Sequence, residues 1–375
     1  MYFKLNPECY LVAGAMRSVV YNLHTGGIIW LNDIQSEHLL KSETGAALTE
    51  PAEVHQALSD KGWGFFCEHP VYVDKVRPLN AFREKRLWKE APSFDIAILQ
   101  IVNQCNQRCN GCGASFCPIC LVDDSAKQIK PTLETAEWRQ VIKSLASAGA
   151  ASILFTGGEC MLHPDLHILI LQAIQERMRV AVQTNGLIPL DYLPEFVAVT
   201  IRLNMAEDFE RIAANIQNRQ QIDFLCQDFS PDLLAGKLAP GWTARPVMSD
   251  GPHISRIAMT QCGLDRFFVK KNRDSCLNGK MFICHDGSMV PCLEQRHKVI
   301  GNVLHDNFSD LYKLLINDYW CAPLMESAEI RKCKHCEFIY ACNSCRVLNV
   351  EQRCSYDPDE GKWSSVDVLL ETMGG

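Results

Sequence analysis

The sequence of 375 residues predicts an α/β protein built around a parallel sheet that is closed, or partly closed, into a barrel. Strand-like and helix-like stretches alternate from residue 94 onward. The first of these strands, residues 95–102, is almost entirely apolar, as expected in a sheet covered on both faces. Polar or glycine-containing loops follow the strands, which is where such barrels carry their chemistry.

Length and charge exclude several classes of protein. The chain is long enough for two or three domains, and its formal net charge of -7 argues against binding nucleic acid by phosphate neutralisation. Its first residues lack a basic stretch followed by an apolar one, and no apolar run approaches the roughly 18 residues of a membrane span. We therefore expect a cytoplasmic protein that binds no nucleic acid and has no membrane span.

Residues 1–76 are predicted to form a small recognition module. Strands are expected at 9–13, 18–23, 27–32 and 65–73, and helices at 34–40 and 50–58. Residues 77–93 form a charged, helix-prone stretch, which we interpret as a linker helix; a basic surface facing a partner is the alternative.

The barrel is predicted over residues 94–265. A helix that opens at Pro131 and ends at Gly149 carries its apolar residues at helical spacing. Further strands are expected at 152–156, 179–184, 199–204, 222–225 and 254–259, with a helix at 165–178. Repeated strand-helix units imply right-handed crossovers and a parallel sheet.

The 19 cysteines are the most informative residues, because clustered thiols in a reducing compartment usually hold metal or do redox chemistry. Cys105, Cys109 and Cys112 form a C-x3-C-x2-C loop directly after the first barrel strand. Three thiolates in one loop can hold three irons of a cubane cluster and leave the fourth iron open. A zinc site completed by Cys117 or Cys120 is the alternative.

This loop resembles the signature of the radical S-adenosylmethionine (radical SAM) superfamily. Thr156-Gly-Gly-Glu159 and Thr184-Asn185-Gly186 resemble two further segments of that family. The resemblance implies a catalytic 4Fe-4S cluster on Cys105, Cys109 and Cys112. It also implies that S-adenosylmethionine contacts five residues, namely Gly157, Gly158, Glu159, Asn185 and Arg202.

Taken alone, these segments have simpler readings. The glycine pair is a tight turn, Asn-Gly is an ordinary turn signal, and Arg202 is an arginine in an ion pair. The chain departs from the family at Gly111, where an aromatic residue usually packs near the adenine, so that role falls to Phe116. Cys117 and Cys120 are extra to the family pattern and are expected to be structural thiols.

A second set of cysteines lies in residues 266–375. Its spacing resembles the SPASM extension of radical SAM enzymes, which holds two auxiliary 4Fe-4S clusters; zinc ribbons are the alternative. The resemblance assigns Cys276, Cys292 and Cys345 to the first auxiliary cluster and Cys333, Cys336, Cys342 and Cys354 to the second. Cys284 is either the fourth ligand of the first cluster or a packed thiol, and in the latter case one iron stays open for substrate.

Members with this extension commonly modify peptides, and residues 1–76 are similar in element order to modules that bind leader peptides. We therefore expect a ribosomally made precursor peptide as partner, with its leader added as a strand beside residues 27–32 and the helix at 34–40. A domain that only covers the barrel is the alternative. A reductase, flavodoxin or ferredoxin is the expected electron donor.

The resemblance implies a peptide maturase that removes a hydrogen from carbon and installs a crosslink. A carbon-carbon cyclophane between an aromatic side chain and a nearby β-carbon is favoured. A thioether crosslink and the formylglycine chemistry of sulfatase maturases are alternatives, and a metal-binding scaffold or sensor is the non-enzymatic one. The predicted architecture is thus a partial (β/α)6 radical SAM barrel between a winged-helix-like module and a SPASM extension.

Overall fold

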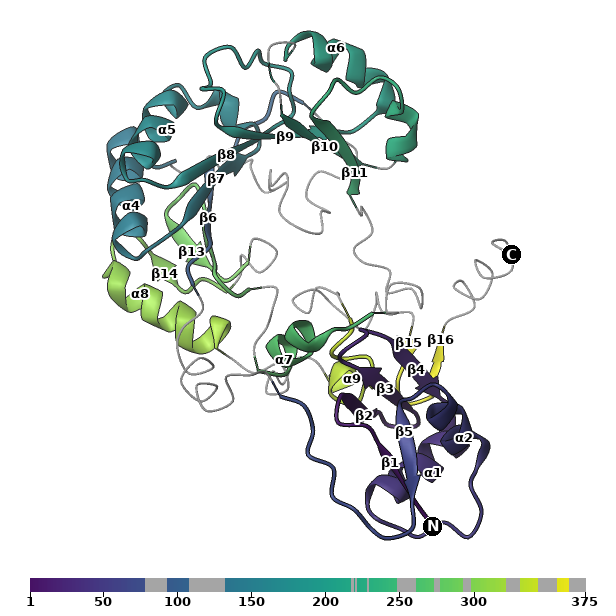
Figure 1. The fold of residues 1–375 in the computed structure, drawn as a ribbon. Helices are drawn as coiled ribbons and strands as arrows, with labels where there is room; N and C mark the ends of the chain where they lie inside the picture. The colour runs from purple at the N-terminus through teal and green to yellow at the C-terminus, as the bar shows by residue number, and fades with distance from the viewer. Residues whose placement is uncertain are drawn as a thin grey trace. The chain divides into compact units, whose positions relative to one another are not determined.

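Two compact units make up the chain in the computed structural model (Figure 1). It describes residues 1–77, 93–107, 132–216, 219, 221–227, 229–247, 261–272, 277–292, 298–321, 331–342 and 356–363. Unit 1 comprises Met1–Glu90, Pro252–Ser275 and Cys321–Gly375, and unit 2 comprises Ala91–Gly251 and Cys276–Trp320. Residues 266–375, predicted as one domain, are thus shared between the two units. Among the described residues, no helix is long and apolar enough to cross a membrane.

A three-stranded antiparallel sheet organises the N-terminal residues, and its strands lie where three of the predicted strands were expected. Its strands are β2 (Cys9–Ala13), β3 (Ser18–Asn22) and β4 (Ile28–Leu31). Helix α1 (Asp33–Glu43) begins directly after β4, because the Asn32 side chain accepts from the backbone N–H of Gln35 at 2.8 Å while the Gln35 side chain accepts from that of Asn32 at 3.1 Å. Helix α2 (Glu53–Asp60) and strand β5 (Gly64–Cys67) follow.

Two N-terminal details differ from the sequence prediction. Strand β1 (Tyr2–Leu5) was not expected; it pairs antiparallel with β5. Strand β5 ends at Cys67 instead of continuing to residue 73. The chain beyond it packs back onto the start of the module, where Lys75 Nζ donates to the carbonyl oxygens of Leu5, Asn6 and Cys9.

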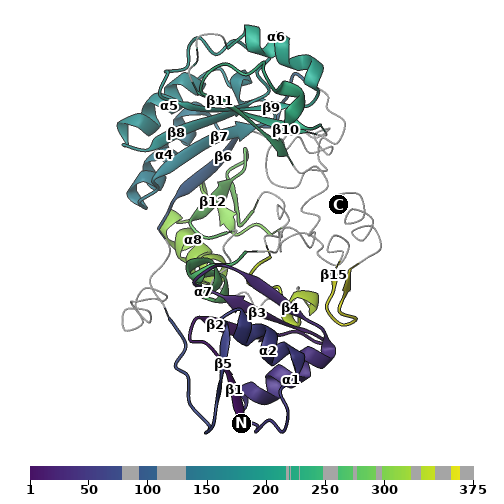
Figure 2. The same cartoon turned by 45° about the vertical axis from the view of Figure 1, so that its right-hand side comes forward.

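Both faces of the small sheet are buried within unit 1. Val20 and Leu31 pack with Phe3 and Leu39 on the side of α1 and α2, which lie beside the sheet in Figure 2. Alternate residues point the other way, so Val19 and Tyr21 pack with Phe267 of α7 (Leu264–Asn272) and with residues 338–342. The Tyr21 and Phe267 rings lie 5.4 Å apart. The module therefore shares a core with the C-terminal cysteine segment.

Unit 2 is built on a nine-stranded sheet in the order β11-β10-β9-β8-β7-β6-β12-β13-β14. Strands β6 to β11 run parallel, and β12 pairs parallel with β6. The first six are β6 (Ile96–Val102), β7 (Ser152–Gly157), β8 (Arg179–Thr184), β9 (Ala198–Leu203), β10 (Ile222–Gln227) and β11 (Trp242–Val247). The remaining three are β12 (Lys280–Ile283), β13 (Ser288–Val290) and β14 (Gly301–Asn302). The predicted mixed α/β fold with a parallel-dominated sheet is confirmed.

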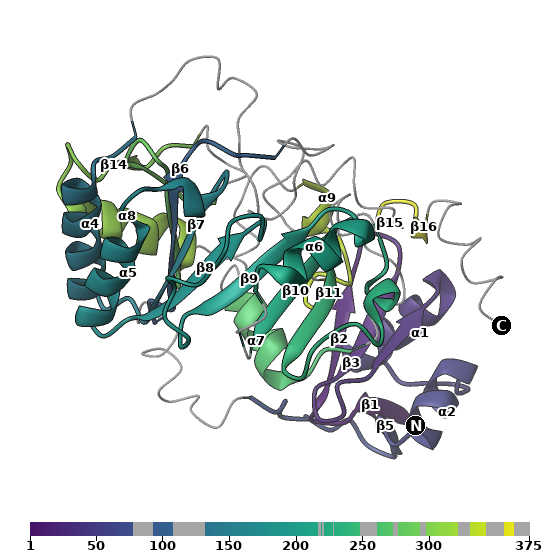
Figure 3. The same cartoon turned by 90° about the horizontal axis from the view of Figure 1, so that it is seen from above.

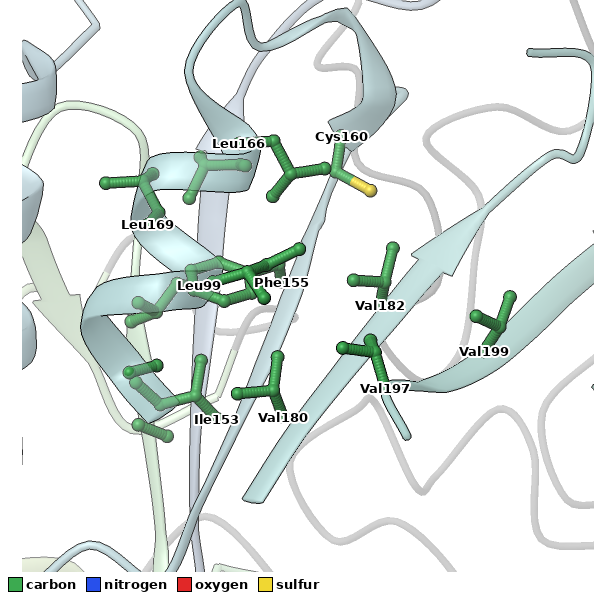
Figure 4. Close-up of a cluster of buried hydrophobic side chains, with 14 of the residues drawn as sticks. Leu99, Ile153, Phe155, Cys160, Leu166, Leu169, Val180, Val182, Val197 and Val199 are labelled. Atoms are coloured by element: carbon green, nitrogen blue, oxygen red, sulfur yellow. The ribbon is translucent and has the colours of Figure 1, made fainter. Parts of the chain in front are cut away.

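Helices cover the outer face of this curved sheet (Figures 1 and 3). They are α4 (Thr135–Ser147), α5 (Leu166–Gln175), α6 (Phe209–Ala214) and α8 (Phe308–Leu315). One face of each strand supplies the core beneath them: Leu99, Phe155, Val182 and Val199 are buried together with Leu169 of α5 (Figure 4). The opposite face of the sheet is left for the site. The described part of unit 1 also contains three short elements, namely α9 (Arg331–Lys334), β15 (Tyr356–Asp357) and β16 (Lys362–Trp363).

The structure corrects two elements of the barrel prediction. Helix α4 begins at Thr135 and not at Pro131, because the Leu133 N–H donates to the His285 carbonyl at 2.9 Å and holds residues 132–134 extended. Strand β11 was missed in a stretch predicted as irregular. The predicted linker helix and the strand at 254–259 fall largely or wholly outside the described residues.

Candidate active site

The candidate site lies where the parallel strands β6, β7 and β8 end. Cys105 follows β6, the Gly157-Gly158-Glu159 segment ends β7, and Asn185 follows β8. Because the three strands are neighbours in the sheet and run parallel, their carboxyl ends meet at one edge. The structure therefore brings these predicted residues together.

The glycine pair allows β7 to approach β6 closely. Gly157 has φ +149°, and a Cβ there would overlap the carbonyl oxygen of Val102. Just beyond, the Gly158 N–H donates to that same carbonyl at 3.2 Å, and the Glu159 N–H donates to the Gln104 carbonyl at 2.8 Å. The backbone of the segment is thus tied to the residue that precedes Cys105.

The carboxylate of Glu159 joins the ends of β7 and β8. Its Oε1 accepts from the Thr184 hydroxyl at 2.7 Å and from the Met161 N–H at 2.9 Å, and its Oε2 accepts from the Asn185 N–H at 2.7 Å. The side chain is fully buried, and this burial raises the pKa of Glu159 although the three hydrogen bonds oppose the shift. Oε1 also faces the Cys160 Sγ at 4.0 Å, whereas Oε2 accepts from a single donor among the described residues, so the acceptor position left for a ligand is on Oε2. Its contact with S-adenosylmethionine stays a prediction.

Asn185 reaches from β8 to the cysteine loop. Its Nδ2 donates to Asn106 Oδ1 at 2.7 Å and lies 3.9 Å from the Sγ of Cys105, while its Oδ1 accepts from the Leu187 N–H at 3.0 Å. The Gln107 N–H also points at this sulfur, at 3.4 Å. Two N–H groups are thus directed at one sulfur, and hydrogen bonds to the sulfur ligands are one of the features that tune iron-sulfur clusters. The surroundings of Cys105 thus fit a cluster ligand.

Arg202 is buried near the end of β9, with 5% of its surface exposed. It lies one residue beyond Ile201, which pairs with Thr184 of β8, so it belongs to the same end of the sheet as Asn185. Its role toward a cofactor stays a prediction.

Several predicted residues fall outside the described part of the chain. These are Cys109 and Cys112 of the first motif, Cys276, Cys345 and Cys354 of the second, and also Gly111, Phe116, Cys117 and Cys120. Within the described ranges, no three His, Cys, Asp or Glu side chains gather as a metal-binding group. The composition of the three predicted clusters therefore stays a prediction.

The described cysteines of the second set divide between the units. Cys284 and Cys292 are buried thiols at the β12–β13 hairpin of unit 2, where the Cys284 N–H donates to the Ser288 carbonyl at 2.9 Å. Cys333, Cys336 and Cys342 belong to unit 1. Burial raises the pKa of Cys336 well above its ordinary value, and the neighbouring Glu337 adds to that shift.

Two features of the site were not predicted from the sequence. The contact of Thr184 with Glu159 links two motifs that are separate in the chain. On β11, Arg245 pairs with Asp223 of β10 through its Nε at 2.8 Å. No motif marks this second pair, and only recognition of β11 as a strand would have aligned Arg245 with the site face.

Comparisons with known proteins agree with the motif at the site. Residues 99–221 match the model of the radical SAM superfamily, so the chain contains a radical SAM domain, which is the catalytic domain of a family of enzymes. A curated relative is the Fe-coproporphyrin III synthase of Methanosarcina barkeri (strain Fusaro / DSM 804), 30% identical over 125 residues. The match covers 31% of this chain and 29% of the relative, so the chain spans less than a third of that protein's length.

Two solved structures are similar at low identity. Streptococcus suis SuiB bound to S-adenosylmethionine is 11% identical with a TM-score of 0.41, and the match covers 97% of this chain and 99% of SuiB. Native anSMEcpe with bound AdoMet is 13% identical with a TM-score of 0.47, covering 74% of this chain and 94% of that one.

Proposed function

We propose that this chain, whose residues 99–221 carry a radical SAM domain, is a radical SAM maturase that crosslinks a ribosomally made precursor peptide. The observation that carries the proposal is the meeting of Cys105, Glu159 and Asn185 at one end of the parallel sheet. These residues come from three different strand ends, so their convergence depends on the fold and not on a single loop.

Each residue of the site has a distinct role in this proposal. Cys105, Cys109 and Cys112 would hold the catalytic 4Fe-4S cluster, and the N–H groups of Gln107 and Asn185 face the Cys105 sulfur. When bound, the cluster and S-adenosylmethionine supply an adenosyl radical that removes a hydrogen atom from an unactivated carbon.

The residues around the cysteine loop position the cofactor. Gly157 and Gly158 offer backbone groups at the close β6–β7 contact. Glu159 joins the ends of β7 and β8, and its Oε2 has an acceptor position left for the methionine ammonium. Asn185 and Arg202 contribute polar groups from β8 and β9. Burial of Glu159 and Arg202 keeps water away from this part of the site.

Two auxiliary 4Fe-4S clusters complete the proposed enzyme. The ligands of the first would be Cys276, Cys292 and Cys345, with Cys284 as the candidate fourth. The ligands of the second would be Cys333, Cys336, Cys342 and Cys354. Cys284 lies at the end of β12, which pairs directly with β6, the strand that leads to Cys105. Because forming a crosslink removes two hydrogens from the peptide, one proton and one electron remain after the radical step. An auxiliary cluster bound by these cysteines would supply the electron acceptor.

The N-terminal module is the proposed binding site for the leader of the precursor. Strand β4 pairs with β3 on one edge, and the only further pairing described for its edge is the single bridge from Gly27 to Gln261. Helix α1 follows β4 without a loop and exposes Ile34, 64% of whose surface is accessible. A leader added as a strand to β4 would place an apolar side chain against Ile34.

The proposed crosslink is a carbon-carbon cyclophane, with a thioether as the alternative. The test is to search beside the gene for a short open reading frame, to co-express the peptide it encodes with the enzyme, and to measure the peptide mass before and after thiol alkylation. A loss of about two hydrogen masses per crosslink, with every cysteine still alkylatable or none present, supports the cyclophane. The same loss with blocked thiols shows a thioether, and an unchanged mass contradicts peptide crosslinking.

A further inference from the structure

A row of polar side chains crosses the inner face of the sheet in unit 2. Strand register places Gln100 beside Thr156, Gln183 beside Thr200, Thr200 beside Asp223, and Asp223 beside Thr243. Thr156 and Gln183 complete the row, since their oxygens lie 3.4 Å apart. The neighbouring row, with Leu99, Phe155, Val182 and Val199, points into the core under the helices. The polar row therefore lies on the face opposite that core.

The row ends at β10 and β11 in a small charged cluster. Asp223 Oδ1 accepts from the Thr243 hydroxyl at 3.0 Å, and Asp223 Oδ2 accepts from Arg245 Nε at 2.8 Å. The strands align Asp223 with Thr243, and Arg245 lies two residues farther toward the carboxyl end of β11. All three side chains thus share the inner face, and Arg245 is on the side where Cys105 lies.

In this pair the two terminal nitrogens of the Arg245 guanidinium are not bound by Asp223. Asp223 binds the guanidinium through Nε, and within the described residues neither terminal nitrogen makes a hydrogen bond. The Arg245 side chain is 63% exposed, whereas that of Asp223 is 30% exposed. A guanidinium held in this way presents two parallel N–H groups, which match the two oxygens of a carboxylate.

Arg245 also stands apart from the proposed cofactor residues. Leu225 of β10 pairs with Arg202 on one side and with Arg245 on the other, so these two arginines are separated by two strand spacings, about 10 Å. A group bound by Arg245 would therefore lie beside the cofactor region and not within it. That is the position a substrate needs.

We propose that Arg245, positioned by Asp223 and Thr243, binds a carboxylate of the peptide substrate on the inner face of the sheet. The inference rests on the peptide-modifying function proposed above and names the chemistry that this part of the site selects. The carboxylate belongs to an Asp or Glu side chain or to the end of the peptide.

The test measures binding of three synthetic peptides to the anaerobically reconstituted enzyme by equilibrium dialysis. The probes are Ac-Gly-Trp-Gly-Glu-Gly-NH2, its Gln counterpart with a C-terminal amide, and the Gln counterpart with a free C-terminal carboxylate. We expect at least one carboxylate peptide to bind the wild type about threefold to tenfold more tightly than the neutral amide, as suits a partly exposed charged contact. Whichever carboxylate peptide shows this preference identifies the source of the group.

Arg245→Gln is expected to remove this preference. The matched control is Arg211→Gln, because Arg211 is 62% exposed and pairs with Asp208 at 2.9 Å on helix α6, at the outer face of the sheet. Loss of the preference in Arg245→Gln but not in Arg211→Gln supports the inference. Equal binding of all three peptides by the wild type, or a preference that survives Arg245→Gln, overturns it. Deoxyadenosine formation by the same wild-type preparation reports separately on the proposed function.

Discussion

Glu159 Oε2 accepts a hydrogen bond from the backbone N–H of Asn185 at 2.7 Å, and this contact ties the end of β7 to the end of β8. Asn185 in turn donates to Asn106 in the cysteine loop after β6. Three strand ends are thus held in register by one buried carboxylate and one amide. The arrangement couples the stability of the sheet edge to the geometry of the proposed active site.

Replacing Glu159 by Gln should lower the stability of this sheet edge and disturb the geometry of the proposed active site. The amide keeps one acceptor oxygen but turns an NH2 group toward N–H or O–H donors, so buried donors lose their partner. We expect the free energy of unfolding to fall by about 2–3 kcal/mol, measured by urea denaturation. Glu207→Gln, at an exposed position of unit 2, is the control and should change little. Equal stability of the two variants would show that the buried carboxylate does not hold these strands together.

Gly157→Ala should destabilise unit 2 strongly. The added methyl group would overlap the Val102 carbonyl, and φ +149° is a conformation that alanine rarely adopts. We expect a loss of about 3 kcal/mol or more in the free energy of unfolding, read from thermal unfolding.

Gly149→Ala separates the two causes of that loss. Gly149 also has positive φ, at +88°, but a Cβ there meets no atom within 4 Å. This variant should lose only about 1–2 kcal/mol, the cost of the backbone conformation. If the free energy of unfolding fell equally in both variants, the close contact of β7 with β6 would not contribute to the loss in Gly157→Ala.

The N-terminal module should lose stability as the pH falls below neutrality. The Ala52 N–H donates to His55 Nδ1 at 3.1 Å, so the ring proton is on Nε2, which donates to Ser42 Oγ at 2.7 Å. Burial lowers the pKa of His55, and this effect outweighs the opposing hydrogen bond with the backbone of His38. Because protonation is harder in the fold than in the unfolded chain, the unfolded state gains protons first, and stability falls as the pH drops through 6.5.

His55→Gln tests this dependence. The variant is expected to be less stable at pH 7.5 but to lose less on going to pH 5.5 than the wild type does, when unit 1 unfolding is followed by near-ultraviolet circular dichroism. His24→Gln is the control, because His24 is exposed. A variant whose pH dependence matched that of the wild type would exclude His55 as the titrating group.

A fragment of residues 1–77 should not fold stably on its own. Val19, Tyr21 and Leu23 lose the partners that residues 262–268 and 338–342 provide, and the Tyr21 hydroxyl loses its 2.7 Å hydrogen bond to the Glu337 carbonyl. We expect the fragment to bind hydrophobic dye and to unfold without cooperativity. A cooperative thermal transition of the fragment would contradict the shared core.

Tyr21→Phe in the full chain is the milder version of this experiment. It removes only the hydroxyl, so unit 1 should lose about 1 kcal/mol. Tyr72→Phe, at a position that is 87% exposed, should have no measurable effect. Equal effects of the two substitutions would show that the hydrogen bond to Glu337 does not stabilise unit 1.

Local periodicity and turn signals predicted most strands. The β2–β4 sheet and β6 to β10 follow from apolar runs bounded by glycine and polar turns, and the glycine pair at 26–27 marked its hairpin. Strand β1 was missed because its partner β5 lies some sixty residues away, and β11 because its stretch carries Trp242, Arg245 and Pro246 without a regular pattern. Pairing over such distances is decided by packing that a local window does not contain.

The candidate site likewise contains residues that short motifs predicted and contacts that they did not. The cysteine spacing marked Cys105, and the resemblance of two short motifs to a known family marked Gly157, Glu159 and Asn185. The hydrogen bond from Thr184 to Glu159 and the pair of Arg245 with Asp223 depend on strand register, which no motif records. The packing of residues 338–342 on β3 likewise joins segments from opposite ends of the chain.

Formation of 5'-deoxyadenosine from S-adenosylmethionine, by the anaerobically reconstituted enzyme with a chemical reductant, tests the proposed active site without need of a peptide. We expect the wild type to produce deoxyadenosine and the variant with Cys105, Cys109 and Cys112 all changed to Ala to produce none. Production of deoxyadenosine by that triple variant at the wild-type rate, or its absence from an iron-loaded wild type, would contradict the assignment of a radical SAM active site to this sheet edge.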